Sequence, residues 1–136
     1  MAASIVHAAG CLCGAVRYEA TGEPDNITHC HCADCRKSSG APFVTWASFR
    51  GHNFRLTHGT PREIAWAGRV RSFCANCGTT LTFLSEPDAD EVDVAVCSFD
   101  YPDAILPQDH TWTEDRLPWI QLADDLPRYA RTRNKK

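Results

Sequence analysis

The cysteines of this chain lie in three short clusters, and their spacing restricts what the chain can fold into. The clusters are Cys11-Leu12-Cys13-Gly14, Cys30-His31-Cys32-Ala33-Asp34-Cys35 and Cys74-Ala75-Asn76-Cys77-Gly78, and the eighth cysteine, Cys97, stands apart. Partners two or three residues apart are too close for relaxed disulfides. Such groups are typical of metal sites, in which thiolates from two turns converge on one ion. The pattern therefore predicts a small fold held together by metal ions.

Length and charge limit the classes of protein to which the chain can belong. At 136 residues it is expected to form one domain, 1–136. It has 14 Lys and Arg residues against 17 Asp and Glu residues, a net charge of -3, so no nucleic-acid partner is expected. Basic residues gather at the end, over 128–136, and this segment is expected to be a flexible tail.

The sequence also indicates a compartment. No stretch approaches the roughly 18 apolar residues of a membrane span, and the N-terminal segment lacks the basic region of a secretory signal. We therefore expect a cytoplasmic protein with no membrane partner. Thiols stay reduced in that compartment, which again favours metal binding over disulfides.

Short apolar runs separated by turn residues predict a mainly β fold. Strands are expected over 15–20, 41–49, 50–59, 61–68, 79–84 and 91–100. The last of these is the clearest, because valines at 92, 94 and 96 fall on one face and Cys97 falls on the other. Helices are expected to be short, over 33–39 and 122–126.

The first and third clusters together predict a closed four-thiolate site. A C-x-C pair in an extended segment points both sulfurs the same way, and in C-x-x-C-G the chain wraps around an ion. The glycine tolerates the positive φ that such a turn often needs, and backbone N–H groups then face the sulfurs. We expect a structural zinc bound by Cys11, Cys13, Cys74 and Cys77. The alternative, a redox pair at Cys74 and Cys77, needs a βαβ context that the sequence lacks.

The remaining cluster, Cys30, Cys32 and Cys35, leaves one position of a tetrahedral ion unfilled. Three protein ligands with an exchangeable fourth position are typical of catalytic zinc. Zinc with three thiolates has a net charge of about -1 and is a weak Lewis acid, so it is better suited to holding an incoming thiol as a nucleophilic thiolate. Arg36 and Lys37 follow directly and are candidates for binding substrate carboxylates, with an ordinary surface role as the alternative.

Other side chains compete for the fourth position. Cys97 could complete a second closed four-thiolate site, or it could be a small residue of a half-buried strand. His29 and His31 point away from the sulfurs if the segment is extended, which favours packing or hydrogen bonding. His31 is also a candidate catalytic acid–base group.

Five segments in order along the chain carry a resemblance to a known family, and they are GCLCGAVRYEA, CHCADCRKSSGAPF, RSFCANCGTTL, FDYPDAILPQDHTW and LPWIQLADDLPRY. Together they resemble the glutathione-dependent formaldehyde-activating enzyme (GFA) family, also called the CENP-V/GFA family, over nearly the whole chain. The resemblance implies an Mss4-like fold of β-sheets bound together by zinc. It assigns a structural zinc to the C-x-C and C-x-x-C pairs and a second, activity-associated zinc to Cys30, Cys32 and Cys35.

Some further positions bear on the resemblance. Arg71, His110 and Trp119 fall on positions that recur in the family. Where members often have a glycine in a G-T/S-hydrophobic-D segment, this chain has Cys97-Ser-Phe-Asp100. If this strand passes near the second zinc, Cys97 could reach the open position, which would argue against activity.

The activity that the resemblance implies is that of a zinc-dependent carbon–sulfur lyase similar to S-(hydroxymethyl)glutathione synthase. Two zinc ions are expected, the second more labile because it has three protein ligands. The partners implied are a small thiol, glutathione, and a small aldehyde, formaldehyde. The alternative is a non-catalytic zinc-stapled binding module or a carrier of a thiol such as glutathione, and an open fourth position on the second ion favours the enzyme or the carrier.

Overall fold

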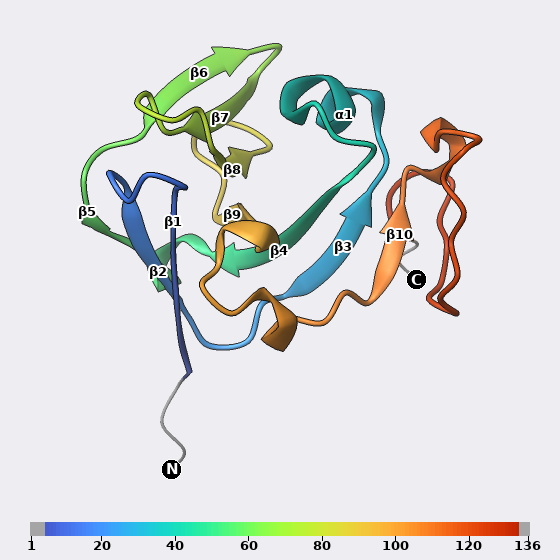
Figure 1. Cartoon of the computed structure of the whole chain (residues 1–136), viewed down its shortest axis with the longest axis horizontal. Coiled ribbons are helices and arrows are strands. Elements are labelled where there is room, and N and C mark those ends of the chain that lie inside the picture. The colour runs from blue at the N-terminus through green and yellow to red at the C-terminus, as the bar shows by residue number, and fades with distance from the viewer. Residues whose placement is uncertain (1–4, 134–136) are drawn as a thin grey trace.

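The computed structural model describes residues 5–133, which form two β-sheets and one short α-helix (Figure 1). The smaller sheet is antiparallel and has the order β1-β2-β5, with β1 at Val6–Gly10, β2 at Arg17–Thr21 and β5 at Phe54–His58. The larger sheet has the order β10 (Asp109–Thr111), β3 (Asn26–Cys30), β4 (Val44–Arg50), β9 (Glu91–Ala95), β8 (Thr80–Leu84), β7 (Arg69–Phe73) and β6 (Arg62–Trp66).

The larger sheet is antiparallel except at one edge, where β10 pairs with β3 in parallel. The helix α1, Ala33–Ser39, follows β3 directly and ends at Gly40, whose φ of 74° gives the left-handed cap that favours glycine. Four short 3₁₀ helices complete the described elements: η1 (Gly51–Asn53), η2 (Val96–Ser98), η3 (Pro102–Ala104) and η4 (Thr113–Asp115).

The two faces of the larger sheet have different environments, because side chains alternate along each strand. On β4, Ala47 and Phe49 are almost fully buried in the main core. On β9, Val92 and Val94 belong to the same core. This core also contains residues of the smaller sheet, so one face of the larger sheet packs against the smaller sheet. The opposite face is left to build the site described below.

After η4 the chain returns to the edge of the larger sheet, beside β10 (Figure 1). We call residues 127–133 the C-terminal strap. His110 N–H donates to the Pro127 carbonyl at 2.9 Å, and Tyr129 N–H donates to the His110 carbonyl at 2.9 Å. Residues 128–133 of the expected flexible tail are thus docked on the sheet, and 134–136 lie outside the described residues.

Most of the expected elements are present, and the chain is a mainly β single domain as predicted. The strands expected over 15–20, 41–49, 50–59, 61–68 and 79–84 are confirmed as β2, β4, β5, β6 and β8, and the helix over 33–39 as α1. The helix expected over 122–126 was wrong, since these residues have no regular structure. The strand expected over 91–100 ends early, because β9 stops at Ala95 and the chain turns into η2.

Four strands were not expected, namely β1, β3, β7 and β10. Their sequences explain why: β1 reads VHAAG and β3 reads NITHC, so neither is rich in the large β-branched residues that signal a strand. The three residues of β10 are all buried, and only pairing with β3 makes them a strand. Tertiary contacts determine whether such short segments form strands.

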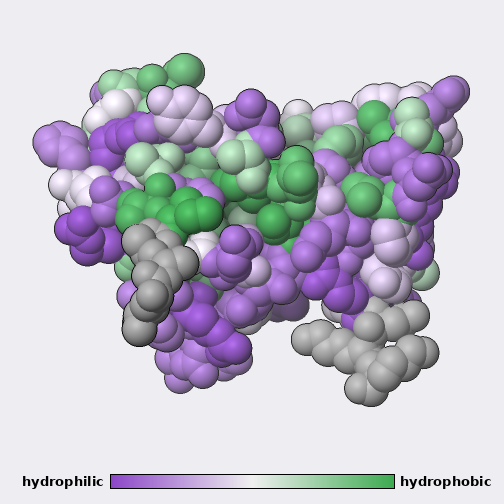
Figure 2. Space-filling view, turned by 90° about the horizontal axis from the view of Figure 1, so that it is seen from below, coloured by the Kyte–Doolittle hydropathy of each residue, from purple (hydrophilic) through white to green (hydrophobic). Residues whose placement is uncertain are grey.

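Two surface features complete the description. No helix within residues 5–133 has the length and apolar character that a membrane crossing requires. The face seen from below carries a patch of apolar surface (Figure 2). A hollow of about 610 Å³ in this region is lined by β1 and by the segment around η3, including Val6, Ile105 and Leu106.

We expect truncation of the core to destabilise the fold strongly. Leu81 on β8 is 1% exposed within the main core, and Leu81→Ala should lower the free energy of unfolding by about 2–5 kcal/mol because it leaves a cavity. Leu106→Ala is the matched control, since Leu106 is 72% exposed and its truncation should change stability by less than about 0.5 kcal/mol. Urea denaturation of both variants measures the difference, and equal effects would contradict this description of the core.

Candidate functional site

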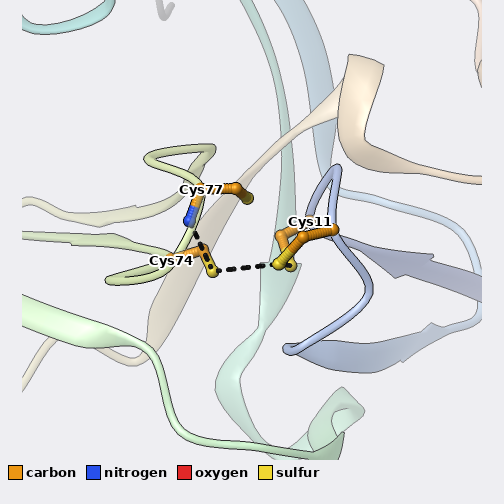
Figure 3. Close-up of side chains that lie close together, drawn as sticks. Cys11, Cys74 and Cys77 are labelled. Atoms are coloured by element: carbon orange, nitrogen blue, oxygen red, sulfur yellow. Dashed lines mark hydrogen bonds between the residues drawn. The ribbon is translucent and has the colours of Figure 1, made fainter.

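Four cysteines from two distant turns form one cluster. Cys11 and Cys13 lie in the turn after β1, and Cys74 and Cys77 lie in the turn after β7. Cys11 faces Cys74 and Cys77 across the cluster (Figure 3). Their sulfur atoms all lie within 4.8 Å of one another. The C-x-C pair thus lies in a turn and not in the extended segment that was expected, but the two pairs converge as predicted.

The sulfur separations in this cluster suit a shared zinc ion. Two sulfurs that each lie about 2.3 Å from a tetrahedral zinc are about 3.8 Å apart. The Sγ atoms of Cys11 and Cys13 are 3.6 Å apart, and those of Cys13 and Cys74 are 3.8 Å apart. All four cysteines are free thiols, so no disulfide competes. The donor set therefore fits a closed zinc site, and Cys74 and Cys77 do not stand alone as a redox pair.

Backbone N–H groups surround these sulfurs, as the turn sequences predict. Val16 N–H donates to Cys11 Sγ at 3.2 Å, and Cys77 N–H donates to Cys74 Sγ at 3.4 Å. The turn after Cys77 passes through Gly78, whose φ is 82°, a conformation that other residues adopt only with strain. A hydrogen bond with the Thr79 hydroxyl, 3.1 Å from Cys77 Sγ, lowers the pKa of Cys77 to about 5. These contacts favour the thiolate form that binds a metal.

The second cluster is formed where β3 passes into α1. Cys30 is the last residue of β3, Cys32 is the N-cap of α1, and Cys35 lies in the first turn of that helix. Their sulfurs lie within 4.8 Å of one another, with those of Cys30 and Cys35 at 3.5 Å. Cys32 Sγ accepts the Cys35 N–H at 3.2 Å, so it acts as the helix cap that Ser or Asp usually provides.

Hydrogen bonds already favour a thiolate in this cluster. The thiols of Cys30 and Cys35, with the backbone N–H groups at the start of α1, hold the pKa of Cys32 far below its usual range. The indole N–H of Trp46 on β4 donates to Cys35 Sγ at 3.4 Å. These sulfurs also suit one tetrahedral zinc by their separations.

The second cluster contains three ligands and not four. Across the described part of the chain, 5–133, no other His, Cys, Asp or Glu places a ligand atom within the group. Cys97 lies in η2, is exposed and belongs to neither cluster. Its expected place in a half-buried strand was wrong, because β9 ends two residues earlier. Closure of this site by Cys97 is therefore not supported.

A cavity of about 540 Å³ adjoins the three-sulfur cluster. All three cysteines line it, and its floor is the face of the larger sheet opposite the main core. A row of directly paired residues crosses this floor from β3 to β7, and its members are Asn26, Ser48, Asp93, Phe83 and Arg71. The cavity thus combines three cysteine sulfurs with polar and cationic side chains.

The polar groups of the floor are held in place by their neighbours. Ser48 Oγ donates to the Asp93 carboxylate at 2.5 Å, and burial raises the pKa of Asp93. The guanidinium of Arg71 lies over the Phe83 ring, with its central carbon 4.9 Å from the ring centroid. Arg69 and Arg133 also line the cavity.

The histidines near the cysteines form a separate buried network. His31 is fully buried, and its Nε2 lies 2.9 Å from Nδ1 of His110. His110 Nε2 is 3.0 Å from the Asp124 carboxylate, so this nitrogen carries the proton that it donates. In the neutral form of His110, Nδ1 then accepts and His31 Nε2 donates. Burial, together with the neighbouring histidines, lowers the pKa of His31 to about 4, so it is neutral at pH 7.

The position of His31 in this network differs from the one expected for a catalytic acid–base group. His31 does not line the cavity, because the extended backbone that directs Cys30 and Cys32 to one side directs His31 to the other. His29 lies on the network side as well, stacked on His110 at 4.8 Å between ring centroids. The network therefore attaches β3 and β10 to the segment that contains Asp124.

The expected carboxylate-binding residues do not line the cavity. Cys35 faces the cavity, and Arg36 and Lys37 are about 100° and 200° further around α1. The cavity has Arg69, Arg71 and Arg133 in their place. Of these, Arg71 was indicated by the family resemblance. No local pattern identifies the other two, since the pairing of β7 with β8 and the docking of the strap bring them to the site.

Among the other family positions, His110 belongs to the buried network and Trp119 is 67% exposed.

We predict that the four-sulfur cluster is required for stability and that Cys97 is not a ligand. Cys74→Ser should lose one zinc per chain and lower the thermal midpoint, because it removes one thiolate of a closed site that joins the two sheets. Cys97→Ser should keep the zinc content and the midpoint of the unmodified protein. Metal analysis and thermal unfolding measure both, and loss of zinc from the Cys97 variant would contradict the assignment.

Comparisons with known proteins agree with this arrangement. A model of the family described as "Glutathione-dependent formaldehyde-activating enzyme" matches residues 6–115. A Schizosaccharomyces pombe protein named an "uncharacterized lyase" is 32% identical over 73 residues, which are 54% of this chain and 53% of that protein. The chain thus spans about half the length of this curated relative.

The crystal structure of a Rhodobacter sphaeroides protein is similar to the fold, with a TM-score of 0.56 and 20% identity, over 90% of this chain and 98% of that one. This similarity concerns the fold alone. The family match extends over both cysteine clusters and most of the two sheets. The chain therefore belongs to the glutathione-dependent formaldehyde-activating enzyme family.

Proposed function

We propose that the protein is a zinc-dependent carbon–sulfur lyase that interconverts S-(hydroxymethyl)glutathione with glutathione and formaldehyde. The observation that carries the proposal is the three-cysteine group at the wall of a cavity, with no fourth ligand among residues 5–133. Membership of the family supports the substrates, and the name of the relative supports the class of lyase.

Two zinc ions would be held by the two cysteine groups. Cys11, Cys13, Cys74 and Cys77 would hold a structural ion, and Cys30, Cys32 and Cys35 would hold the ion of the active site. An ion with three protein thiolates and one exchangeable position supplies a place in which a substrate thiol is bound as its thiolate at neutral pH. Cys32 caps α1 and Cys35 receives the indole N–H of Trp46, so both sulfurs have fixed orientations before a metal binds.

The proposed reaction needs no oxidant or reductant. In the synthetic direction the glutathione sulfur attacks the formaldehyde carbon, and one S–C bond forms. The C=O double bond becomes a C–O single bond, and the proton lost by the thiol ends on the new hydroxyl oxygen. In the reverse direction the S–C bond breaks and formaldehyde leaves. Holding both reactants in one cavity contributes most of the acceleration that is expected.

The charges of the cavity suit glutathione, which has two carboxylates and one ammonium group around a central thiol. Arg71 and Arg69 on β7 offer N–H donors to a carboxylate. Asp93 on the floor offers a carboxyl group whose pKa is raised by burial, so it keeps its proton to a higher pH than a free Asp and can donate it to a developing alkoxide. His31 has no place in this proposal, because it lies outside the cavity.

Spectroscopy of the cobalt-substituted protein tests the open position. We expect added glutathione to strengthen the sulfur-to-cobalt charge-transfer absorption, because a fourth sulfur joins Cys30, Cys32 and Cys35. Cys35→Ser should abolish this change, and Cys97→Ser, the matched control, should retain it. If added glutathione leaves the spectrum of the unmodified protein unchanged, the proposed thiol-binding position is excluded.

Exchange kinetics test the catalysis. The protein loaded with zinc should accelerate the interconversion of glutathione plus formaldehyde with S-(hydroxymethyl)glutathione, measured by NMR exchange at equilibrium, and Cys35→Ser should return the rate to that of the uncatalysed reaction. Glutathione binding without acceleration would instead identify a thiol carrier. If the protein neither binds glutathione nor accelerates the exchange, the zinc-stapled structural module is the remaining interpretation.

A further inference from the structure

The C-terminal strap forms part of the wall of the cavity, although it lies beyond the segment, 6–115, that matches the family model. Backbone hydrogen bonds fix its position along β10, and Trp112 N–H donates to the Arg131 carbonyl at 2.8 Å. Two residues of the strap, Thr132 and Arg133, reach the cavity. The strap therefore adds side chains to a site whose sulfurs come from β3 and α1.

Arg133 is held in a defined orientation by a buried carboxylate. Its Nε donates to Oδ2 of Asp109 on β10 at 2.5 Å, and its Nη2 lies 3.4 Å from Oε1 of Gln108. The Asp109 side chain is 3% exposed, and that of Arg133 is 28% exposed. An ion pair with so buried a partner is screened little by solvent, which distinguishes it from ordinary surface pairs. A guanidinium has five N–H donors, so this anchoring leaves others for a ligand.

Arg133 and Arg71 approach the cavity from opposite sides. Arg71 lies on β7, one strand in from the β6 edge, and the strap that bears Arg133 lies on the edge strand β10, with β3, β4, β9 and β8 between them. The three-cysteine group also lines this space. The cavity thus offers two guanidinium groups and a sulfur site, and a thiol that carries two carboxylates has complementary groups for all three.

We propose that Arg133, oriented by Asp109, is a specificity-determining residue that binds one carboxylate of the thiol ligand, opposite Arg71. The proposal rests on the function proposed above for the identity of the ligand. Arg133 selects ligands by their charge and takes no part in the transfer of a proton or the formation of a bond. Asp109 is a positioning residue, because it acts on the ligand only through the guanidinium.

Arg133→Ala and Arg131→Ala provide a matched test. Arg131 lies in the same strap but pairs with Glu114, is 72% exposed along its side chain and does not line the cavity. The probes are S-methylglutathione, which has both carboxylates and no thiol, and 2-mercaptoethanol, which has a thiol and no carboxylate. Calorimetry on the zinc-loaded protein measures the binding of S-methylglutathione. The absorption spectrum of the cobalt-substituted protein measures the binding of 2-mercaptoethanol.

We expect Arg133→Ala to weaken S-methylglutathione binding by about 10- to 100-fold, the range of a lost charge-assisted hydrogen bond. It should leave the response to 2-mercaptoethanol unchanged, and Arg131→Ala should change neither. Arg133→Lys should restore part of the affinity, since it keeps the charge without the planar fork. Asp109→Asn should weaken S-methylglutathione binding with no effect on 2-mercaptoethanol, whereas a merely structural role would change both.

The proposal is overturned if S-methylglutathione binds the Arg133→Ala variant as tightly as it binds the unmodified protein. It is also overturned if S-methylglutathione binds to neither of these two proteins. An equal loss of 2-mercaptoethanol response would also overturn it, because the substitution would then have disturbed the sulfur site. Arg133→Lys keeps the test decisive if the alanine variant does not fold. S-methylglutathione does not need the open position, so a failure of the thiol chemistry and a failure of this proposal give different results.

Discussion

The four-sulfur cluster joins parts of the chain that are far apart in sequence and belong to different sheets. Cys13 and Cys74 are 61 positions apart, and they connect the turn after β1 in the smaller sheet to the turn after β7 in the larger one. Cys11 and Cys74 are also members of the main core, so the cysteine cluster and the packed interior are continuous. A small β domain buries a limited apolar area, and a bound ion adds its affinity directly to the folding free energy. An ion in this cluster would therefore add to the packing that holds the larger sheet, and with it the cavity, against the smaller sheet.

Because side chains alternate along each strand, the residues of the core and the residues of the cavity lie on opposite faces of the larger sheet. On β4, Ala47 and Phe49 face the core while Trp46 and Ser48 face the cavity, and on β9 the same division separates Val94 from Asp93. A polar row can therefore cross the sheet without placing an unpaired charge in the core. The three-sulfur group adopts the same division at the end of β3, where Cys30 and Cys32 face the cavity and His31 faces the buried histidines.

The sequence was sufficient to predict the parts of the site that depend on local spacing. The grouping of seven cysteines into four and three follows from pairs two, three or five residues apart, and α1 follows from the turn that Cys32 begins. The arginines of the cavity could not be placed in this way, because Arg69 reaches it through the pairing of strands within the larger sheet and Arg133 through the docking of the strap on β10. Arg36 was expected at the site because of its neighbours in sequence, yet the rotation of the helix directs it elsewhere. Short strands such as β10 depend on the same long-range pairing.

The parallel pairing of β10 with β3 has a consequence for the order of folding. Thr28 and Asp109 are 81 positions apart, and the strap can dock only after β10 has found its place. Contacts between such distant segments are slow to form, because a long loop must close before they stabilise anything. The cysteines near β3 and α1 are close in sequence and can assemble early. The three cysteines would therefore come together first, and the strap that borders the cavity would dock last.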